Sequence, residues 1–212
     1  MKKGEFNEQV FINCPFDANY TKIFRAIVFT ILDCGLVPRC SLEVSDATQF
    51  RLRAIIDLIK QCKYAIHDLS RVELDTEFNL PRFNMPFETG IFYGARFFGQ
   101  KRQRTKNCII LEKEKYRYQK FISDLSGIDI NHHNNQIRQV VSEIRNWLAT
   151  SSNKRLPEPQ RILSRYRKFT SALRNACRKT HIDINSLPFI DLTRNMTDWL
   201  KINQIEPHRL FF

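Results

Sequence analysis

The sequence predicts an α/β protein in which a parallel sheet lies between two layers of helices, with a helical extension at the carboxyl end. Short strand-type segments alternate with longer amphipathic segments over residues 1–150, and this alternation is typical of a parallel sheet with helical crossovers. The chain has 212 residues, of which 42% are hydrophobic and 26% charged, as expected for one domain of ordinary size plus a modest appendage. Residues 151–212 contain only helix-type segments.

The first elements follow from local patterns. The segment QVFIN at residues 9–13 is expected to be the first strand, and a helix over about 20–34 is expected to end at Gly35. One face of this helix carries Ile23, Ile27, Thr30 and Ile31. The second strand, at residues 36–40, contains Pro38, which indicates an edge position or a strand end because proline cannot donate a ladder hydrogen bond.

The central elements repeat this pattern. A helix is expected over residues 49–62, a third strand over 64–69 and, after a polar loop, a helix over 84–98. The apolar stripes expected on these helices are Ile55, Leu58, Ile59 and Cys62 on the first, and Phe87, Ile91, Ala95 and Phe98 on the second. Gly90 and Gly94 lie four residues apart, so we expect the second helix to approach another backbone closely.

The remaining elements complete the domain and add the extension. After a basic turn, KRQRTK, the pattern predicts strands at 107–111 and within 126–132, a helix at 135–149, a linker at 150–159, and helices at 159–178 and 186–202. Two helices are too few for an independent core. We therefore expect residues 151–212 to pack on the domain of residues 1–150 or to serve oligomerisation.

Cysteine usage, hydropathy and charge limit the classes of protein. The six cysteines form no C-x-x-C pair, which argues against a zinc ribbon and a disulfide framework and favours a reducing cytoplasm. No apolar run approaches the roughly 18 residues that span a bilayer, so no membrane partner is expected. The net charge is +12, and residues 151–212 carry twelve basic and five acidic side chains. This basic segment is either a solvated helix face or a phosphate or nucleic-acid contact.

Four segments are expected to meet at one edge of the sheet. In open parallel sheets, ligands bind outside the carboxyl ends of the strands. This rule selects residues 13–17, 41–46, 68–71 and 81–88. Neither G-x-G-x-x-G nor G-x-x-x-x-G-K-[ST] is present, so a phosphate would have to be held by arginines and helix ends instead.

Glu88 is the leading candidate for a reacting group. We expect it in the first turn of a helix, where the macrodipole and unpaired N–H groups favour an ionised carboxylate at neutral pH. An anion beside Phe87 would suit an oxocarbenium-like centre or ribose hydroxyls. The alternative is a helix-start glutamate that only favours the dipole.

Other candidate residues follow from the same edge, each with a structural alternative. Asp68 could act as a partner carboxylate or cap the next turn, and Asp17 could bind ligand or cap the first helix. Arg51 is in phase with its helix's apolar stripe, so it needs an anion, either a ligand phosphate or an aspartate such as Asp46 or Asp68. The remaining candidates for nucleotide binding are Asn13, Cys14, Ser70, Arg82 in the loop and Tyr93, which together with Phe92 could stack on a base. His67 is expected to be a buried, satisfied histidine, and no ligand spacing suggests a metal site.

The order of these features resembles the group that unites TIR domains with nucleoside 2-deoxyribosyltransferase-like proteins. The resemblance rests on VFIN at 10–13, HDLS at 67–70 and PFETGIFYGA at 86–95, and it covers residues 9–112. It implies a flavodoxin-like or TIR-like fold. Glu88 matches the glutamate that is the glycosyl nucleophile in deoxyribosyltransferases and serves NAD cleavage in TIR enzymes, and Asn13 stands at the TIR motif's serine. FINCPFD and NMPFE are also similar to a group of uncharacterised bacterial proteins.

The resemblance implies a cytoplasmic, nucleotide-binding N-glycosidase acting on NAD or a related nucleotide, without a resident cofactor. In that mechanism Glu88 reacts at the anomeric carbon while Asn13, Arg51 and Asp68 hold the ribose and phosphate. The resemblance also implies a role in antiphage defence, as a homo-oligomer or with a defence-system partner protein. Two alternatives remain: a non-catalytic nucleotide sensor or adaptor, and a nucleic-acid-binding protein that uses the basic extension.

Overall fold

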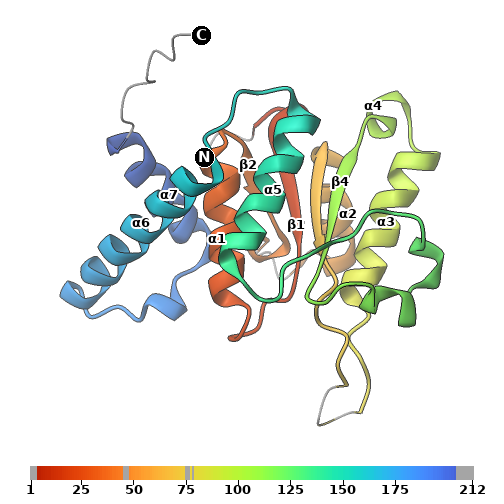
Figure 1. Cartoon of the computed structure of the whole chain (residues 1–212), viewed down its shortest axis with the longest axis horizontal. Helices are drawn as coiled ribbons and strands as arrows, with labels where there is room; N and C mark the ends of the chain where they lie inside the picture. Colours follow the sequence, from red (N-terminus) through yellow and green to blue (C-terminus); the bar gives the residue numbers. More distant parts are fainter. Residues whose placement is uncertain (1–3, 45–47, 75–76, 78, 204–212) are drawn as a thin grey trace.

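The computed structural model describes residues 4–44, 48–74, 77 and 79–203. Its sheet has five strands, all parallel, in the order β2-β1-β3-β4-β5 (Figure 1). The strands are β1 (Gln9–Asn13), β2 (Val37–Arg39), β3 (Tyr64–Asp68), β4 (Asn107–Glu112) and β5 (Asn131–His132). The predicted α/β class is therefore confirmed, and Pro38 lies in the edge strand β2. This strand order is that of flavodoxin-like, doubly wound sheets, in which the connections reverse direction between β1 and β3.

Helices cover both faces of the sheet. They are α1 (Thr21–Asp33), α2 (Arg51–Gln61), α3 (Asn84–Phe98), α4 (Lys101–Arg104), α5 (Ile137–Ser152), α6 (Pro159–Lys179) and α7 (Phe189–Ile202). Successive residues of a strand point to opposite faces, so Val10 and Ile12 pack with α1 and α5, whereas Phe11 packs with α2 and α3. This burial on both faces explains why β1 and β3 are buried along their whole length.

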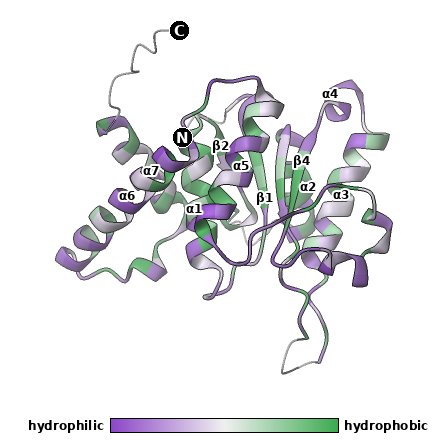
Figure 2. Ribbon diagram, in the orientation of Figure 1, coloured by the Kyte–Doolittle hydropathy of each residue, from purple (hydrophilic) through white to green (hydrophobic). Residues whose placement is uncertain are grey.

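The extension joins the core on the α1 side. The ring of Phe29 on α1 lies 5.5 Å from that of Tyr166, 5.6 Å from that of Phe169 and 6.1 Å from that of Trp199. Arg165 on α6 also pairs with Asp33 at the end of α1, at 2.7 Å. Figure 2 shows hydrophobic residues concentrated on the central strands and α1, whereas α4 and much of α6 are hydrophilic. The helices α6 and α7 therefore bury their apolar faces against the domain.

Several element boundaries differ from the prediction by one to three residues, and three differences concern the local structure itself. The basic turn contains the short helix α4, and the fifth strand is only two residues long. Helix α5 continues through residues 150–152, which were expected in the linker, and ends at Asn153, whose φ of 52° is left-handed. Asparagine tolerates this conformation better than most residues, so it ends the helix.

The predicted apolar stripe of α3 is wrong at two of its four positions, since Ile91 and Ala95 pack against the core but Phe87 and Phe98 do not. Phe87 and Phe98 are 55% and 89% exposed, while Met85, Thr89 and Phe92 are the buried residues of this helix. The predicted close backbone approach is also wrong, because a Cβ added at Gly90 or Gly94 would meet nothing within 4 Å. Because α3 carries aromatic residues on several sides, periodicity alone could not select the side that packs on the sheet.

Two general findings concern membranes and cysteines. No helix of the described chain is long and apolar enough to cross a membrane. All six cysteines are free, and all but Cys108 are buried. Burial raises the pKa of Cys34 and of Cys62 to about 12, so these thiols stay protonated at neutral pH.

Candidate functional site

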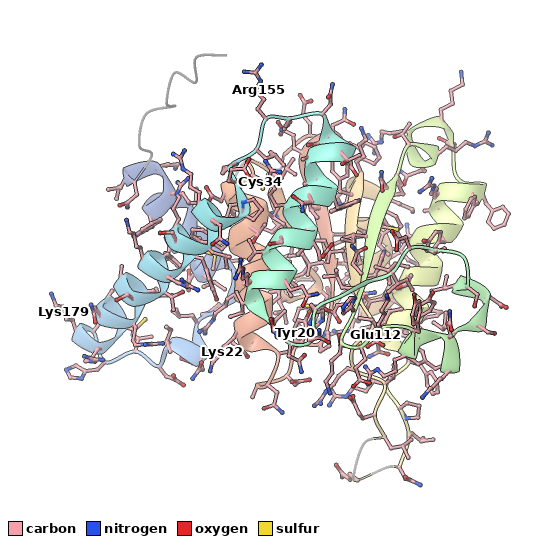
Figure 3. The ribbon with its side chains drawn as sticks, viewed as in Figure 1. Tyr20, Lys22, Cys34, Glu112, Arg155 and Lys179 are labelled. Atoms are coloured by element: carbon pink, nitrogen blue, oxygen red, sulfur yellow. The ribbon has the colours of Figure 1, made fainter. Side chains whose placement is uncertain are left out.

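The carboxyl ends of β1 and β3 bring several predicted residues together. Asn13 ends β1 and Asp68 ends β3, and these strands are neighbours at the point where the connections diverge to opposite faces. Loops leaving such neighbouring strands in opposite directions form a crevice that ligands occupy in this architecture. Figure 3 shows Tyr20, Lys22 and Glu112 at this same lower edge of the molecule. We call it the strand-end edge.

Asn13 ties the strand-end edge to α3. Its Nδ2 donates to the carbonyl of Met85 at 2.8 Å and lies 3.0 Å from Nδ1 of His67 and 3.4 Å from Oγ1 of Thr89. His67 is fully buried, and desolvation, with a smaller effect from Lys106, lowers its pKa to about 3. The imidazole is therefore neutral, so Nδ1 accepts from Asn13 and Nε2 carries the proton. These bonds hold the carbonyl of Met85 and the hydroxyl of Thr89, which lie on either side of Glu88 in the sequence.

Glu88 lies one turn deeper in α3 than predicted. The helix begins at Asn84, so Glu88 is its fifth residue, and the first turn contains no acidic residue. Full ionisation at neutral pH is not supported, because burial raises the pKa of Glu88 to about 7 and the Arg51 guanidinium opposes this only in part. The carboxyl group is therefore only partly ionised at neutral pH. Glu88 is half-buried and makes no hydrogen bond or ion pair to any residue that the structure describes. Such a carboxyl group is typical of functional sites.

Arg51 begins α2 and is exposed, so the expectation that it needs an anion on the buried side is wrong. Its described electrostatic neighbour is Glu88, which places a cation beside the carboxyl group at the ends of α2 and α3. Asp46, the alternative partner, lies outside the described residues. Arg51 and Glu88 therefore lie near each other on the α2–α3 side of the strand-end edge, without forming an ion pair.

Asp68 lies in the opposite environment. Its side chain is fully buried and accepts three hydrogen bonds: from the hydroxyl of Tyr20, from the backbone N–H of Ser70 at 2.9 Å and from Nε2 of His133 at 3.0 Å. These partners come from α1, the loop after β3 and the residue after β5. Asp68 therefore links three segments beneath the strand-end edge, and the N–H of Ser70 gives it the turn-capping role considered above.

The residues Asp68, His133 and Ser70 do not form a nucleophilic triad. Nδ1 of His133 accepts from the backbone N–H of Asn135 at 3.0 Å, so Nε2 carries the proton. That same Nε2 lies 2.9 Å from Oγ of Ser70 and 3.0 Å from Asp68. In a triad the hydroxyl and the carboxylate use opposite ring nitrogens. Here the cluster is a buried network that orders the edge.

A hollow of about 220 Å³ opens beside this network. Asp17, Tyr20, Ser70 and Arg71 line it together with Lys113 and other residues of the neighbouring loops. Asp17 accepts from Nε of Arg71 at 2.9 Å and from the backbone N–H of Tyr20 at 3.2 Å. It therefore caps the turn before α1, and it also bridges the β1 and β3 loops.

Glu112 at the end of β4 anchors the next loop. It is fully buried and accepts from Nε of Arg117 at 2.9 and 3.1 Å and from Nη2 at 2.6 Å. Arg117 also donates to the carbonyl of Ser70 and to Glu73, the latter at 3.1 Å. A bidentate arginine pair holds a loop firmly, so the β3 and β4 loops are fixed to each other.

Cys14 lies near both carboxyl groups, those of Asp68 and Glu88. It is 2% exposed, and burial, then Asp68 and with smaller effects Glu88 and Asp17, raise its pKa. The thiol is therefore protonated and is not an activated nucleophile. Because these carboxyl groups all raise the pKa of Cys14, they lie near the end of β1.

Arg82 and the aromatic candidates lie apart from this group. Arg82 is exposed in the loop before α3, where Leu74 and Pro81 form an isolated antiparallel bridge. The hydroxyl of Tyr93 accepts from Sγ of Cys108, at 3.7 Å, near the beginning of β4. Phe92 is fully buried against His67, with ring centroids 5.1 Å apart, so the expectation that it could stack on a base is wrong. In the described chain, no group of three or more His, Cys, Asp or Glu side chains could hold a metal ion.

Sequence reasoning missed Tyr20, His133 and Arg117, and it selected Arg71 only as part of residues 68–71. Tyr20 and His133 reach Asp68 from positions 48 and 65 residues away in the chain, and no motif links them. The sequence offers a signal for His133 alone, because this residue directly follows a predicted strand and residues at strand ends converge.

Two comparisons of the sequence with known proteins found no match. A scan against protein-family models found no match to the chain, and a search of curated proteins found no similar sequence. The fold and the site therefore define the class, an α/β protein with a doubly wound parallel sheet and a polar strand-end edge.

Proposed function

We propose that the chain binds a nucleotide at the strand-end edge and cleaves its N-glycosidic bond, with NAD or a related nucleotide as the substrate. The observation that supports this most is the state of Glu88, a half-buried carboxyl group with a pKa raised to about 7 and no hydrogen-bond partner among the described residues. A group held in this way is ready to interact with a ligand. The resemblance of PFETGIFYGA to glycosidic-bond enzymes supports the same residue.

In the proposed reaction, ionised Glu88 stabilises or attacks the anomeric carbon of the ribose. The glycosidic bond breaks and its electron pair goes to the nicotinamide nitrogen, which leaves as a neutral ring. Water then adds to the anomeric carbon and releases a proton. Arg51 beside Glu88 supplies a cation for the phosphates.

The test is release of nicotinamide from NAD by the purified full chain, measured by chromatography. Glu88→Gln should lower the rate by about 10²–10⁴-fold, whereas Glu158→Gln, whose side chain is 77% exposed at the start of α6, should leave it unchanged. Because the ionised carboxylate reacts, the wild-type rate should fall as the pH drops through about 7. An unchanged rate in Glu88→Gln would contradict the proposal.

A role in antiphage defence and activation by assembly are part of the proposal through the resemblance alone.

A non-catalytic nucleotide sensor is the second candidate. The observation in its favour is the saturated, fully buried state of Asp68, which leaves this predicted partner without a free oxygen for proton transfer. In this case Glu88 would hydrogen-bond a ribose hydroxyl. Saturable NAD binding without turnover, weakened about tenfold by Glu88→Gln, would favour the sensor over the enzyme.

A further inference from the structure

A second hollow lies where the extension meets the domain. It has a volume of about 830 Å³ and is bounded by the start of α1, by α6 and by the connection between α6 and α7, which contains the short 3-10 helix η5 (Ile184–Ser186). Figure 3 shows Lys22 at this junction and Lys179 at the far end of α6. We call it the junction hollow. Its size falls within the range of about 300–1,000 Å³ that small-molecule sites occupy.

The charged residues that line the junction hollow are all cations. They are Lys22 and Arg25 on α1 and Arg167 and Arg174 on α6, and no aspartate or glutamate is among the lining residues. Lys22, Arg167 and Arg174 make no ion pair or side-chain hydrogen bond to any residue that the structure describes. Elsewhere on the same helix, Arg165 pairs with Asp33 at 2.7 Å. The hollow therefore gathers positive charge that the fold leaves uncompensated, which favours an anionic occupant.

Two helix starts strengthen this positive potential. Thr21 and Ile137, the first residues of α1 and α5, both line the junction hollow. The amino-terminal end of a helix carries about half a positive charge. Phosphate groups are therefore well suited to this place.

The remaining lining provides an apolar wall and neutral polar groups. The ring of Phe16 is 39% exposed at the rim, where it is held edge-on by Phe24 at 5.3 Å. Ser171 and Asn185 also line the hollow. An exposed aromatic ring beside arginines matches a molecule that carries a flat base and phosphates.

We propose that the junction hollow binds a phosphorylated small molecule of the nucleotide class, as a second ligand separate from any substrate at the strand-end edge. The two hollows share Lys22 and Ile137, so the second ligand would contact the same start of α1 that borders the strand-end edge. This proposal does not depend on the chemistry of Glu88.

Calorimetric titration of the full chain with ATP and with inorganic pyrophosphate tests the proposal. Arg167→Glu/Arg174→Glu should weaken saturable binding of both probes by at least about tenfold. The matched control is Lys168→Glu/Lys179→Glu, which makes the same charge change on the same helix at residues outside the hollow and should bind within about twofold of wild type. Arg167→Ala/Arg174→Ala repeats the test with a milder change if the glutamate variant fails to fold.

Three results would overturn the proposal. The first is that neither probe shows saturable binding, and the second is that both double variants lose affinity equally, as a general charge effect would cause. The third is that single-stranded DNA of 20 nucleotides binds far more tightly than ATP, and that Lys168→Glu/Lys179→Glu weakens this DNA binding as much as Arg167→Glu/Arg174→Glu does. That result would indicate a nucleic-acid surface along α6. Glu88→Gln and Arg51→Gln should retain ATP binding at the junction hollow, so failure of the proposed glycosidase remains distinguishable.

Discussion

Asp68 and Glu88 act on the same thiol, that of Cys14, yet their environments are opposite. Asp68 is fully buried and receives hydrogen bonds from three segments of the chain. Glu88 is half-buried, faces one exposed arginine and receives no hydrogen bond from the described residues. A buried carboxylate with all its partners is expected to stabilise the fold, whereas one without partners destabilises it.

This difference separates architecture from function at one edge of the sheet. Groups that hold loops together are satisfied within the protein, as Asp68 and Glu112 are. A residue that lowers stability, as Glu88 is expected to do, is a candidate for a residue that is retained because activity requires it. The predictions below test whether the two carboxyl groups differ in this sense.

The largest effect on stability is expected for Asp68→Asn. The amide would direct an NH₂ group at donors from Tyr20 and His133, so the free energy of unfolding should fall by about 2–4 kcal/mol. Urea denaturation at pH 7 measures this. Asp198→Asn, an exposed site on α7 with a side chain 68% exposed, should change the value by less than about 0.5 kcal/mol. If Asp68→Asn changed the free energy of unfolding as little as Asp198→Asn, the structural role assigned to Asp68 would be wrong.

Glu88→Gln should have the opposite sign. The folded pKa of about 7 exceeds the ordinary value of 4.5, so the folded state binds more protons between these pH values and wild-type stability falls as the pH rises through that interval. At pH 8, the free energy of unfolding of Glu88→Gln should exceed that of wild type by about 1–2 kcal/mol. At pH 4.5 and below the difference should vanish.

The measurement for Glu88→Gln is urea denaturation at pH 4.5, 6 and 8, with Glu158→Gln as the control. A glutamine variant less stable than wild type at pH 8 would mean that Glu88 has a stabilising partner, and the comparison with Asp68 would fail.

A smaller effect is expected for Arg51→Gln. The guanidinium lowers the pKa of Glu88 against the effect of burial, so its removal should raise that pKa by roughly half a unit. Side-chain NMR titration of labelled glutamate can follow this. Arg53 lies on the same helix but pairs with Asp57 at 3.5 Å, so Arg53→Gln should leave the pKa of Glu88 unchanged. Equal shifts of the Glu88 pKa in Arg51→Gln and Arg53→Gln would indicate only the general effect of removing one positive charge from α2.

The smallest effect is expected for the pair between Asp17 and Arg71. The arginine side chain is 41% exposed, and pairs of this kind contribute about 0–1 kcal/mol. A double-mutant cycle with Asp17→Asn and Arg71→Gln should therefore give a coupling energy below about 1 kcal/mol. A value well above this would place Asp17 with the structural groups around Asp68.

The sequence predicts the frame of the molecule better than its contacts. The fully apolar centres of β1 and β3 indicate buried parallel strands, and the strand-end rule correctly places Asn13 and Asp68 at one edge. The direction in which α3 faces is only partly predicted, because Ile91 and Ala95 pack on the core as expected, whereas aromatic residues such as Phe87 and Phe92 lie on different sides of this helix and only one side meets the sheet. Local periodicity does not contain that information.

The electrostatic state of the site depends on tertiary neighbours. The pKa of Glu88 is raised by burial. The helix-dipole argument fails because Glu88 is the fifth residue of a helix that begins at Asn84, as predicted, and therefore lies beyond the first turn. The partners of Asp68 come from α1 and from the end of β5, a convergence that becomes visible only when the strand order is known.

The six free thiols make the protein its own reporter of local opening. Alkylation requires an exposed thiolate, and burial raises the pKa of Cys14, Cys34, Cys40 and Cys62 in the folded chain. Cys177 lies on α6 and Cys34 just after α1, whereas Cys14 follows β1. Pulsed labelling with iodoacetamide, read by mass spectrometry, would thus time the detachment of the carboxyl-terminal helices separately from the loosening of the sheet, with no engineered probe.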